Sequence, residues 1–199
     1  MPRPVIEFWF EFASTYSYLS AMRLPGAARA AGVEIIWRPF LLGPIFAAQG
    51  LSDSPFNLFA SKGAYMWRDM ERRAAAHDLL FRRPEVFPQN GLRAARIAQL
   101  ALRHPGGITF CQHVYDAAFA QARDISDPAT LADCAARAGL PDDIIPRSET
   151  PENKLGLRHC TERAASLGLF GAPSFLVGQE LFWGDDRLQD ALDWAGQHG

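Results

Sequence analysis

The sequence has few of the residues that build disulfide frameworks, metal centres or redox pairs. Its 199 residues include three cysteines, Cys111, Cys134 and Cys160. Their wide spacing forms neither a Cys-x-x-Cys pair nor a cluster of metal ligands. We therefore expect three reduced, mostly buried thiols and no metal site.

Net charge and long apolar runs are also scarce. A formal net charge of −2 and an isoelectric point near 6.2 leave no broad basic field, which argues against a nucleic-acid partner. No stretch is long, apolar and charge-free enough for a signal peptide or a membrane span, so we expect a cytoplasmic protein with no membrane partner. With 48% hydrophobic and 21% charged residues, the composition is that of one globular domain, alone or with an insertion.

The first forty residues predict a strand, a helix and a second strand. Residues 5–12 are rich in β-branched and aromatic side chains, which favours a buried strand. Residues 16–31 are mostly compatible with a helix that Pro25 should kink or interrupt. Residues 33–38 are again β-branched and predict the second strand. Such a unit requires a parallel pair of strands with a right-handed crossover.

The remaining chain first turns helical and then returns to strands. Residues 40–169 are rich in Ala, Leu and Arg, with breaks at Pro and Gly, and predict a block of helices. Residues 174–183 predict a β-hairpin around Gly178, and residues 187–195 a final helix. The expected fold class is therefore α/β, with a large all-helical insertion between the second strand and the C-terminal hairpin.

Two local features have both a structural and a chemical interpretation. Ser14 follows the first strand at the start of a helix. Unpaired amides and the helix dipole there would stabilise a thiolate. A serine at this position is also an ordinary helix cap. Pro173 comes directly before a strand and is a candidate for a cis bond to Ala172, although most X-Pro bonds are trans.

Four segments resemble the 2-hydroxychromene-2-carboxylate isomerase family and its relative, the kappa class of glutathione transferases. They are residues 10–19 (FEFASTYSYL), 62–70 (KGAYMWRDM), 87–90 (FPQN) and 181–188 (LFWGDDRL), so the resemblance spans nearly the full chain. These families belong to the DsbA-like branch of the thioredoxin superfamily. The resemblance therefore implies a thioredoxin-like domain of residues 1–39 and 170–199 and a helical insertion domain of residues 40–169.

The resemblance also implies a glutathione site at Ser14. This serine would be the catalytic residue, with its hydroxyl bonded to the glutathione sulfur to favour the thiolate. The backbone of Ala172, held by a cis bond to Pro173, would pair with the cysteinyl part of glutathione. Because ligands in open α/β sheets bind beyond the carboxyl ends of strands, we expect the helical block to cover the Ser14 end of the sheet.

The ends of glutathione would be bound by charged residues. The resemblance assigns the γ-glutamyl end to Asp185 and Asp186, and the glycyl carboxylate, or an anionic substrate, to Lys62. We expect Lys62 within about 15 Å of Ser14, because a longer span exceeds the reach of lysine even through one water. Two residues depart from the family pattern, since Thr15 stands where the family usually has proline and Asp53 where it has asparagine.

The implied activity is glutathione-dependent isomerisation of an aromatic-derived conjugated acid, by a homodimer that serves aromatic catabolism. A kappa-like glutathione transferase and a non-catalytic glutathione or small-acid binding module are the alternatives. A disulfide oxidoreductase is disfavoured, because serines stand where a redox pair needs cysteines. Five aromatic residues either line a substrate pocket or belong to the core. They are Trp9, Tyr16, Tyr65, Trp67 and Trp183.

Overall fold

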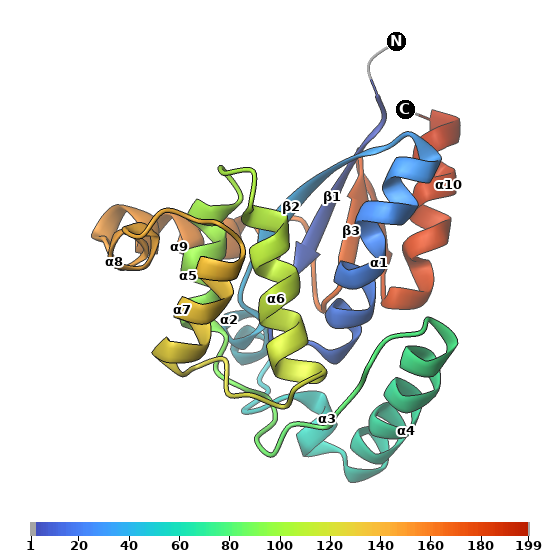
Figure 1. The fold of residues 1–199 in the computed structure, drawn as a ribbon. Helices are drawn as coiled ribbons and strands as arrows, with labels where there is room; N and C mark the ends of the chain where they lie inside the picture. The colour runs from blue at the N-terminus through green and yellow to red at the C-terminus, as the bar shows by residue number, and fades with distance from the viewer. Residues whose placement is uncertain (1–2, 199) are drawn as a thin grey trace.

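A mixed four-stranded sheet runs through the middle of the molecule (Figure 1). The structure is a computed structural model that describes residues 3–198. The strands are β1 (Val5–Phe10), β2 (Glu34–Pro39), β3 (Ser174–Val177) and β4 (Glu180–Trp183). They lie in the order β2-β1-β3-β4, with β1 and β2 parallel and β3 antiparallel to both neighbours. The parallel pair and the hairpin confirm the expectations from the sequence, but β1 ends two residues earlier than expected.

Aromatic pairs hold β2, β1 and β3 together. Phe8 of β1 lies opposite Trp37 of β2 and Phe175 of β3. Its ring meets that of Trp37 edge-on at 4.8 Å between centroids and stacks on that of Phe175 at 5.4 Å. Such cross-strand pairs are the main stabilising unit of a sheet. They explain why residues 5–12 are too apolar for a strand with one solvent-facing side.

Helix α1 (Thr15–Ala31) connects the parallel strands and contains Pro25 in its interior. We expected Pro25 to kink or interrupt this helix, and the interruption does not occur. A proline cannot donate to the carbonyl four residues earlier, which here belongs to Ala21. The side-chain amide of Gln112 donates to that carbonyl instead, at 3.1 Å. The helix ends at Gly32, whose φ of 70° is the left-handed conformation that glycine adopts without strain.

Replacing Gln112 by alanine should therefore destabilise the protein by about 1–3 kcal/mol, the usual effect of leaving one buried carbonyl unpaired. Chemical denaturation at pH 7 measures this change. Gln121→Ala is the matched control, since Gln121 is exposed and bonds Asp116 of its own segment. Equal stability of both variants would show that the Ala21 carbonyl does not need this partner.

Helices cover both faces of the sheet and one of its ends. The segment between β2 and β3 contains α2 (Leu42–Ala48), α3 (Pro55–Leu58), α4 (Ala60–Ala76), α5 (Leu92–Ala101), α6 (Gly107–Phe119), α7 (Pro128–Arg137), α8 (Ile144–Ser148) and α9 (Pro151–Ser166). The chain finishes with the short 3₁₀ helix η1 (Asp185–Arg187) and α10 (Leu188–His198). This is the predicted thioredoxin-like α/β fold with a helical insertion between the second strand and the hairpin.

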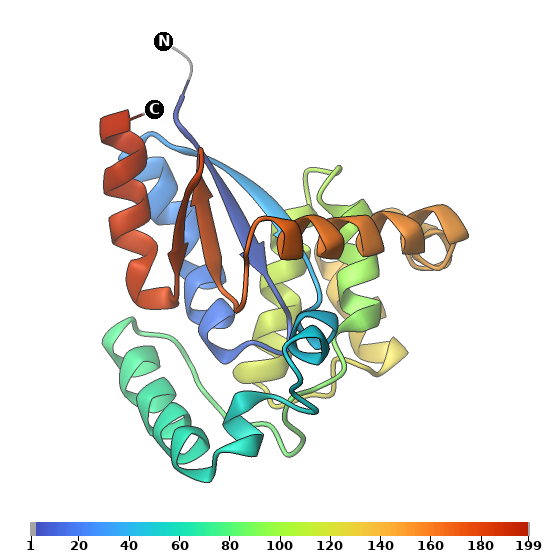
Figure 2. The same cartoon turned by 180° about the vertical axis from the view of Figure 1, so that it is seen from behind.

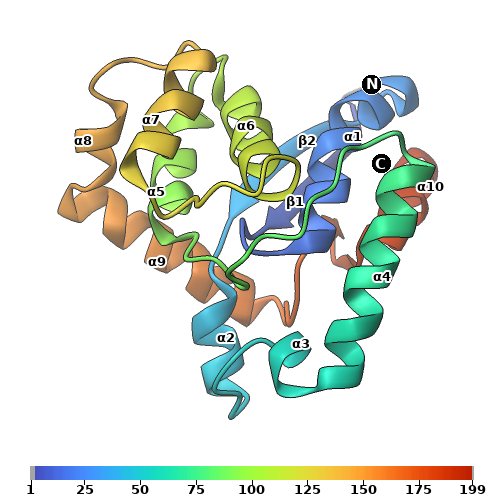
Figure 3. The ribbon, with the colours of Figure 1, turned by 60° about the horizontal axis from the view of Figure 1, so that its bottom comes forward.

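Two buried clusters define the layers. The larger one joins α1, α5, α6 and α10 to one face of the sheet, where Phe10 of β1 packs against Tyr115 of α6 at 6.2 Å between ring centroids. The smaller one packs α2 and α9 on the opposite face around Trp9, as Figure 2 shows from behind. Helices α3 and α4 lie beyond the end of the sheet at which β1 finishes (Figure 3). That end is also where α1 begins, so the Ser14 region lies among these elements.

Candidate functional site

Ser14 is hydrogen-bonded to residues from both ends of the chain. It is the N-cap of α1, and its Oγ accepts the Ser17 N–H at 3.1 Å. The same Oγ donates to the carbonyl of Ala172 at 2.9 Å. Ser14 is thus both a helix cap and the contact between the start of α1 and the segment before β3. Its hydroxyl is only partly buried and stands at the positive end of a 17-residue helix.

The segment opposite Ser14 has the backbone expected from the resemblance. The bond between Ala172 and Pro173 is cis. The carbonyl of Pro173 accepts the N–H of Gly184 at 2.9 Å, which connects this segment to the end of β4. The Ser174 hydroxyl donates to the Gly171 carbonyl at 2.9 Å. These bonds fix the backbone of Ala172 beside Ser14.

Thr15 is almost fully buried, with 1% of its surface exposed. No described residue hydrogen-bonds its hydroxyl, which is not among the fully buried polar atoms without a partner. Its backbone N–H, which a proline would lack, makes no hydrogen bond to another described residue. The change from the family pattern therefore adds one free amide at the start of α1, where an anion is favoured.

Glu11 was missed by the sequence interpretation, which placed it inside the first strand. The chain turns there instead, because the Ser14 N–H donates to the Glu11 carbonyl at 3.0 Å. The side-chain Oε2 accepts the N–H of Ala13 at 3.2 Å. Burial raises the pKa of this carboxyl to about 7, and the hydrogen bond from Ala13 only partly offsets it. The sequence signal was an acidic residue three positions before Ser14, in a run that is apolar apart from Glu7 and Glu11.

The raised pKa of Glu11 has a measurable consequence for stability. Between about pH 4.5 and pH 7 the unfolded chain loses the Glu11 proton while the folded chain keeps it, so this residue lowers stability as the pH rises through that window. Glu11→Gln should therefore unfold at higher denaturant concentration than the wild type at pH 8, by an amount on the order of 1–3 kcal/mol. The difference should shrink toward zero at pH 4. A pH-independent difference would contradict the raised pKa.

Lys62 lies on the face of α4 that turns toward α1. Residues seven and eleven positions later share that face, since 3.6 residues complete a turn. They are Asp69, which accepts the hydroxyl of Tyr16 at 3.0 Å, and Arg73, which pairs with Asp185. The Lys62 ammonium stands 4.7 Å from the ring centroid of Phe59 and makes no ion pair within residues 3–198. Lys62 thus extends the α4 polar stripe that meets α1, and its contact with a ligand stays a prediction.

The two aspartates at the C-terminal motif have different surroundings. Asp185 is 3% exposed, and its carboxylate accepts bonds from the Ser20 hydroxyl at 2.8 Å, from Arg73 Nε at 3.1 Å and from the Arg23 guanidinium. It therefore ties η1 to α1 and α4. Asp186 is exposed, and Arg187 approaches it at 3.7 Å. Of the pair, Asp186 is the carboxylate that a ligand ammonium can reach from solvent.

The five aromatic residues divide between core and surface. Trp9 is fully buried in the smaller cluster and belongs to the core. Tyr16 and Trp67 are partly buried around α4, with the Trp67 ring 4.8 Å from that of Phe87. Tyr65 and Trp183 are mostly exposed. Of the five, Tyr16 is the ring that follows Ser14 in α1, and its hydroxyl bonds Asp69 on the polar stripe of α4.

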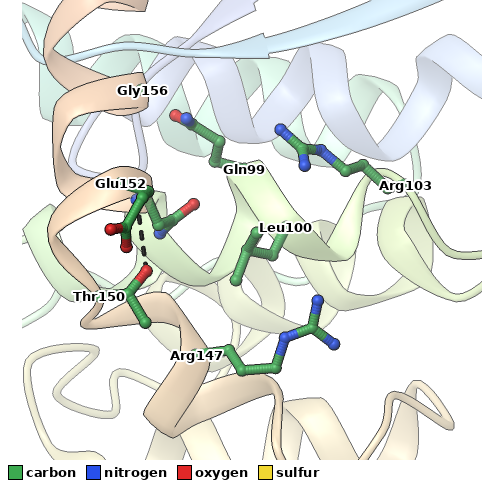
Figure 4. Close-up of a pocket in the computed structure, with 8 residues that line it drawn as sticks. Gln99, Leu100, Arg103, Arg147, Thr150, Glu152 and Gly156 are labelled. Atoms are coloured by element: carbon green, nitrogen blue, oxygen red, sulfur yellow. Dashed lines mark hydrogen bonds between the residues drawn. The ribbon is translucent and has the colours of Figure 1, made fainter.

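Two hollows lie away from Ser14, in the seam between α5 and α9. One has a volume of about 200 Å³ and is lined by Gln99 of α5, Glu152 of α9 and Arg103, which follows α5, among others (Figure 4). The other, of about 540 Å³, follows β2 from Ile35 to Pro39. Neither is lined by a predicted glutathione contact. We place the candidate site at Ser14 because the hydroxyl, the free amide and the Ala172 backbone converge there.

None of the helices in the described part of the chain is long and apolar enough to cross a membrane.

Comparisons with known proteins give the family of the chain. The family model of the DSBA-like thioredoxin domain matches residues 5–193. A 2-hydroxychromene-2-carboxylate isomerase of Sphingobium xenophagum is 30% identical over 92% of this chain and 93% of its own length. Glutathione S-transferase kappa 1 of Homo sapiens is 26% identical over 95% of this chain and 89% of its own length.

A solved 2-hydroxychromene-2-carboxylate isomerase structure superimposes with a TM-score of 0.87 at 21% identity, covering 97% of this chain and 95% of the other. That likeness shows the fold, and the family model together with the 30% identical relative shows the family. The chain belongs to the DSBA-like thioredoxin domain family, in the branch that includes 2-hydroxychromene-2-carboxylate isomerases and kappa-class glutathione transferases.

Proposed function

We propose that this protein binds glutathione at the Ser14 end of the sheet and isomerises an aromatic-derived conjugated acid of the 2-hydroxychromene-2-carboxylate type. The observation that supports the site most directly is the bond from Ser14 Oγ to the Ala172 carbonyl, which places a helix start beside the backbone at the cis-proline. The relatives named as isomerases and as a kappa transferase support the chemistry.

The residues at the site fit a bound thiol. Glutathione supplies a thiolate that adds to a conjugated carbon and leaves again after the substrate has rotated. To donate to that sulfur, the Ser14 hydroxyl turns its single proton away from the Ala172 carbonyl. The unpaired Thr15 N–H and the α1 dipole favour the negative charge on sulfur. The Ala172 backbone orients the cysteinyl unit. Asp186 holds the γ-glutamyl ammonium, while Asp185, already bonded to two arginines, positions η1 for that contact.

Lys62 completes the proposed site from the insertion. A single ammonium on the α4 face that meets α1 suits the glycyl carboxylate or the carboxylate of the substrate. Tyr16 and the rings near α4 form the apolar side that an aromatic acid needs. The proposal also includes a cytoplasmic homodimer, for which light scattering should give twice the chain mass of 22.0 kDa.

The test is isomerisation of 2-hydroxychromene-2-carboxylate, followed by absorbance with and without glutathione. We expect turnover that requires glutathione and does not consume it. Conjugation of a chlorinated nitrobenzene with loss of free thiol, and no isomerisation, would instead assign the kappa-like transferase reaction that the human relative suggests. Glutathione binding without either reaction would leave a binding module.

A further inference from the structure

Glu11 lies in the turn that leads into Ser14 and has no charged partner. No cationic side chain within residues 3–198 forms an ion pair with it. Its Oε2 has one hydrogen bond, from Ala13 N–H at 3.2 Å, and its Oε1 has none from a described residue. The residue as a whole is partly exposed, and Oε1 is not among the buried polar atoms without a partner. This oxygen therefore keeps some contact with solvent. An unpaired carboxyl in largely apolar surroundings is costly for stability, and such groups concentrate at functional sites.

The loop that follows α4 leaves room for this carboxyl. A side chain at Gly91 would place its Cβ 3.0 Å from Glu11 Oε1 and 3.2 Å from the Cβ of Phe12. Glycine at this position thus lets the loop pass closely over Glu11 while Oε1 stays free of it. The side chain of Asn90, the preceding residue, accepts the Leu92 N–H at 3.1 Å and so ties the loop to the start of α5.

The other groups around Glu11 do not titrate near neutral pH. From α6, the Tyr115 hydroxyl donates to the Glu11 carbonyl at 3.0 Å, and burial raises the pKa of Tyr115 well above its usual value. Cys111, on the same helix, is buried, and burial raises the pKa of its thiol far above the usual range. The loop over Glu11, residues 87–91, contains no titratable side chain. Glu11 is thus the group that changes charge near pH 7 on this side of Ser14.

We propose that Glu11 is the base that accepts the proton of the glutathione thiol when the thiol binds at Ser14. This inference rests on the proposed function. The S–H bond breaks, its electron pair stays on sulfur, and a new O–H bond forms on Glu11. Ala13, whose N–H bonds Oε2, directly precedes Ser14. The proposal requires the proton to pass directly or through one water.

Electrostatics favours this exchange over release of the proton to solvent. Two anions close together in apolar surroundings oppose each other, so a thiolate beside an ionised Glu11 would be disfavoured. Transfer of the proton leaves one negative charge on the pair before and after binding. The two groups then titrate as a coupled pair. Ser14 and the α1 dipole determine that the charge resides on sulfur.

The experiment counts protons when glutathione binds, and it needs no substrate. Calorimetric titration at about pH 8, where a carboxyl with a pKa of about 7 is ionised, is run in buffers of different ionisation enthalpy, with thiolate absorbance recorded near ~240 nm. Wild type should form the thiolate and release close to zero protons per bound glutathione. In Glu11→Gln, which keeps the hydrogen-bond acceptor for Ala13, either about one proton per bound thiolate appears in the buffer or the thiolate signal falls about tenfold.

The matched control is Glu7→Gln, because Glu7 is a carboxylate of β1 that pairs with Arg38 and Arg163 outside the site. It should behave as the wild type does. Release of about one proton by the wild type, thiol binding without thiolate absorbance, or equal proton counts and absorbance in the wild type and Glu11→Gln would each overturn the role of Glu11. Absence of glutathione binding to the wild type would remove the proposed function itself. The two failures are therefore distinguishable.

Discussion

Replacing Asp185 by alanine is expected to lower the free energy of unfolding by about 3–5 kcal/mol, the range found when one partner of a buried ion pair is removed. The carboxylate is buried and bonded to Ser20, Arg23 and Arg73. Its loss removes the buried carboxylate that Arg23 and Arg73 share. Denaturant unfolding at pH 7 measures the change in the free energy of unfolding. We expect both this loss of stability and a weakened attachment of α4.

Asp186→Ala is the matched control for this substitution. Asp186 is the neighbouring aspartate and is exposed, so its removal should change stability by less than about 0.5 kcal/mol. Under the proposed function this variant should instead weaken glutathione binding. A stability loss of equal size in both variants would mean that the buried network does not hold η1 to α1 and α4.

Ser14→Ala should raise the pKa of bound glutathione by about 1–2 units and lower glutathione-dependent activity at neutral pH by roughly 10- to 100-fold. These values correspond to the loss of one charge-assisted hydrogen bond, about 1.5–3 kcal/mol. The pKa is obtained from thiolate absorbance against pH with glutathione bound. Ser14 Oγ also accepts the Ser17 N–H, so the variant loses a helix cap as well.

The effect of the lost cap is separated by a second cap variant. Thr150 caps α9 by accepting the Asn153 N–H at 3.4 Å and lies in a different part of the fold. Thr150→Ala should lose a similar stability, typically about 1 kcal/mol, with no change in the bound thiol pKa. If the titration midpoint in Ser14→Ala equals that of wild type, Ser14 is a helix cap without a role in thiolate activation.

Much of the fold follows from local sequence patterns. The β1, α1 and β2 unit is marked by β-branched runs, a capping serine and Gly32, and the hairpin by the turn at Gly178. The interruption expected at Pro25 is absent because a residue 87 positions later, Gln112, supplies the missing donor to Ala21. Such a partner belongs to the tertiary structure and leaves no trace in a local window.

The site was predictable only in part, for a similar reason. The positions of Ser14 and of the cis bond before Pro173 follow from motifs that resemble a known family, and the structure brings them within one hydrogen bond of each other. The sequence analysis assigns Asp185 and Asp186 alike to the γ-glutamyl end of glutathione. Their difference depends on Arg73, more than a hundred positions away in the chain. The environment of Glu11 likewise depends on the distant loop that passes over it.

The central claim is that a thiol binds at the start of α1, beside Ser14 and Ala172. A crystal structure of the protein soaked with glutathione tests it most directly. The account predicts the sulfur within about 3.5 Å of Ser14 Oγ, a usual limit for such a contact, and the cysteinyl backbone paired with Ala172. Glutathione found instead in the seam between α5 and α9, with its sulfur remote from Ser14, would contradict the account.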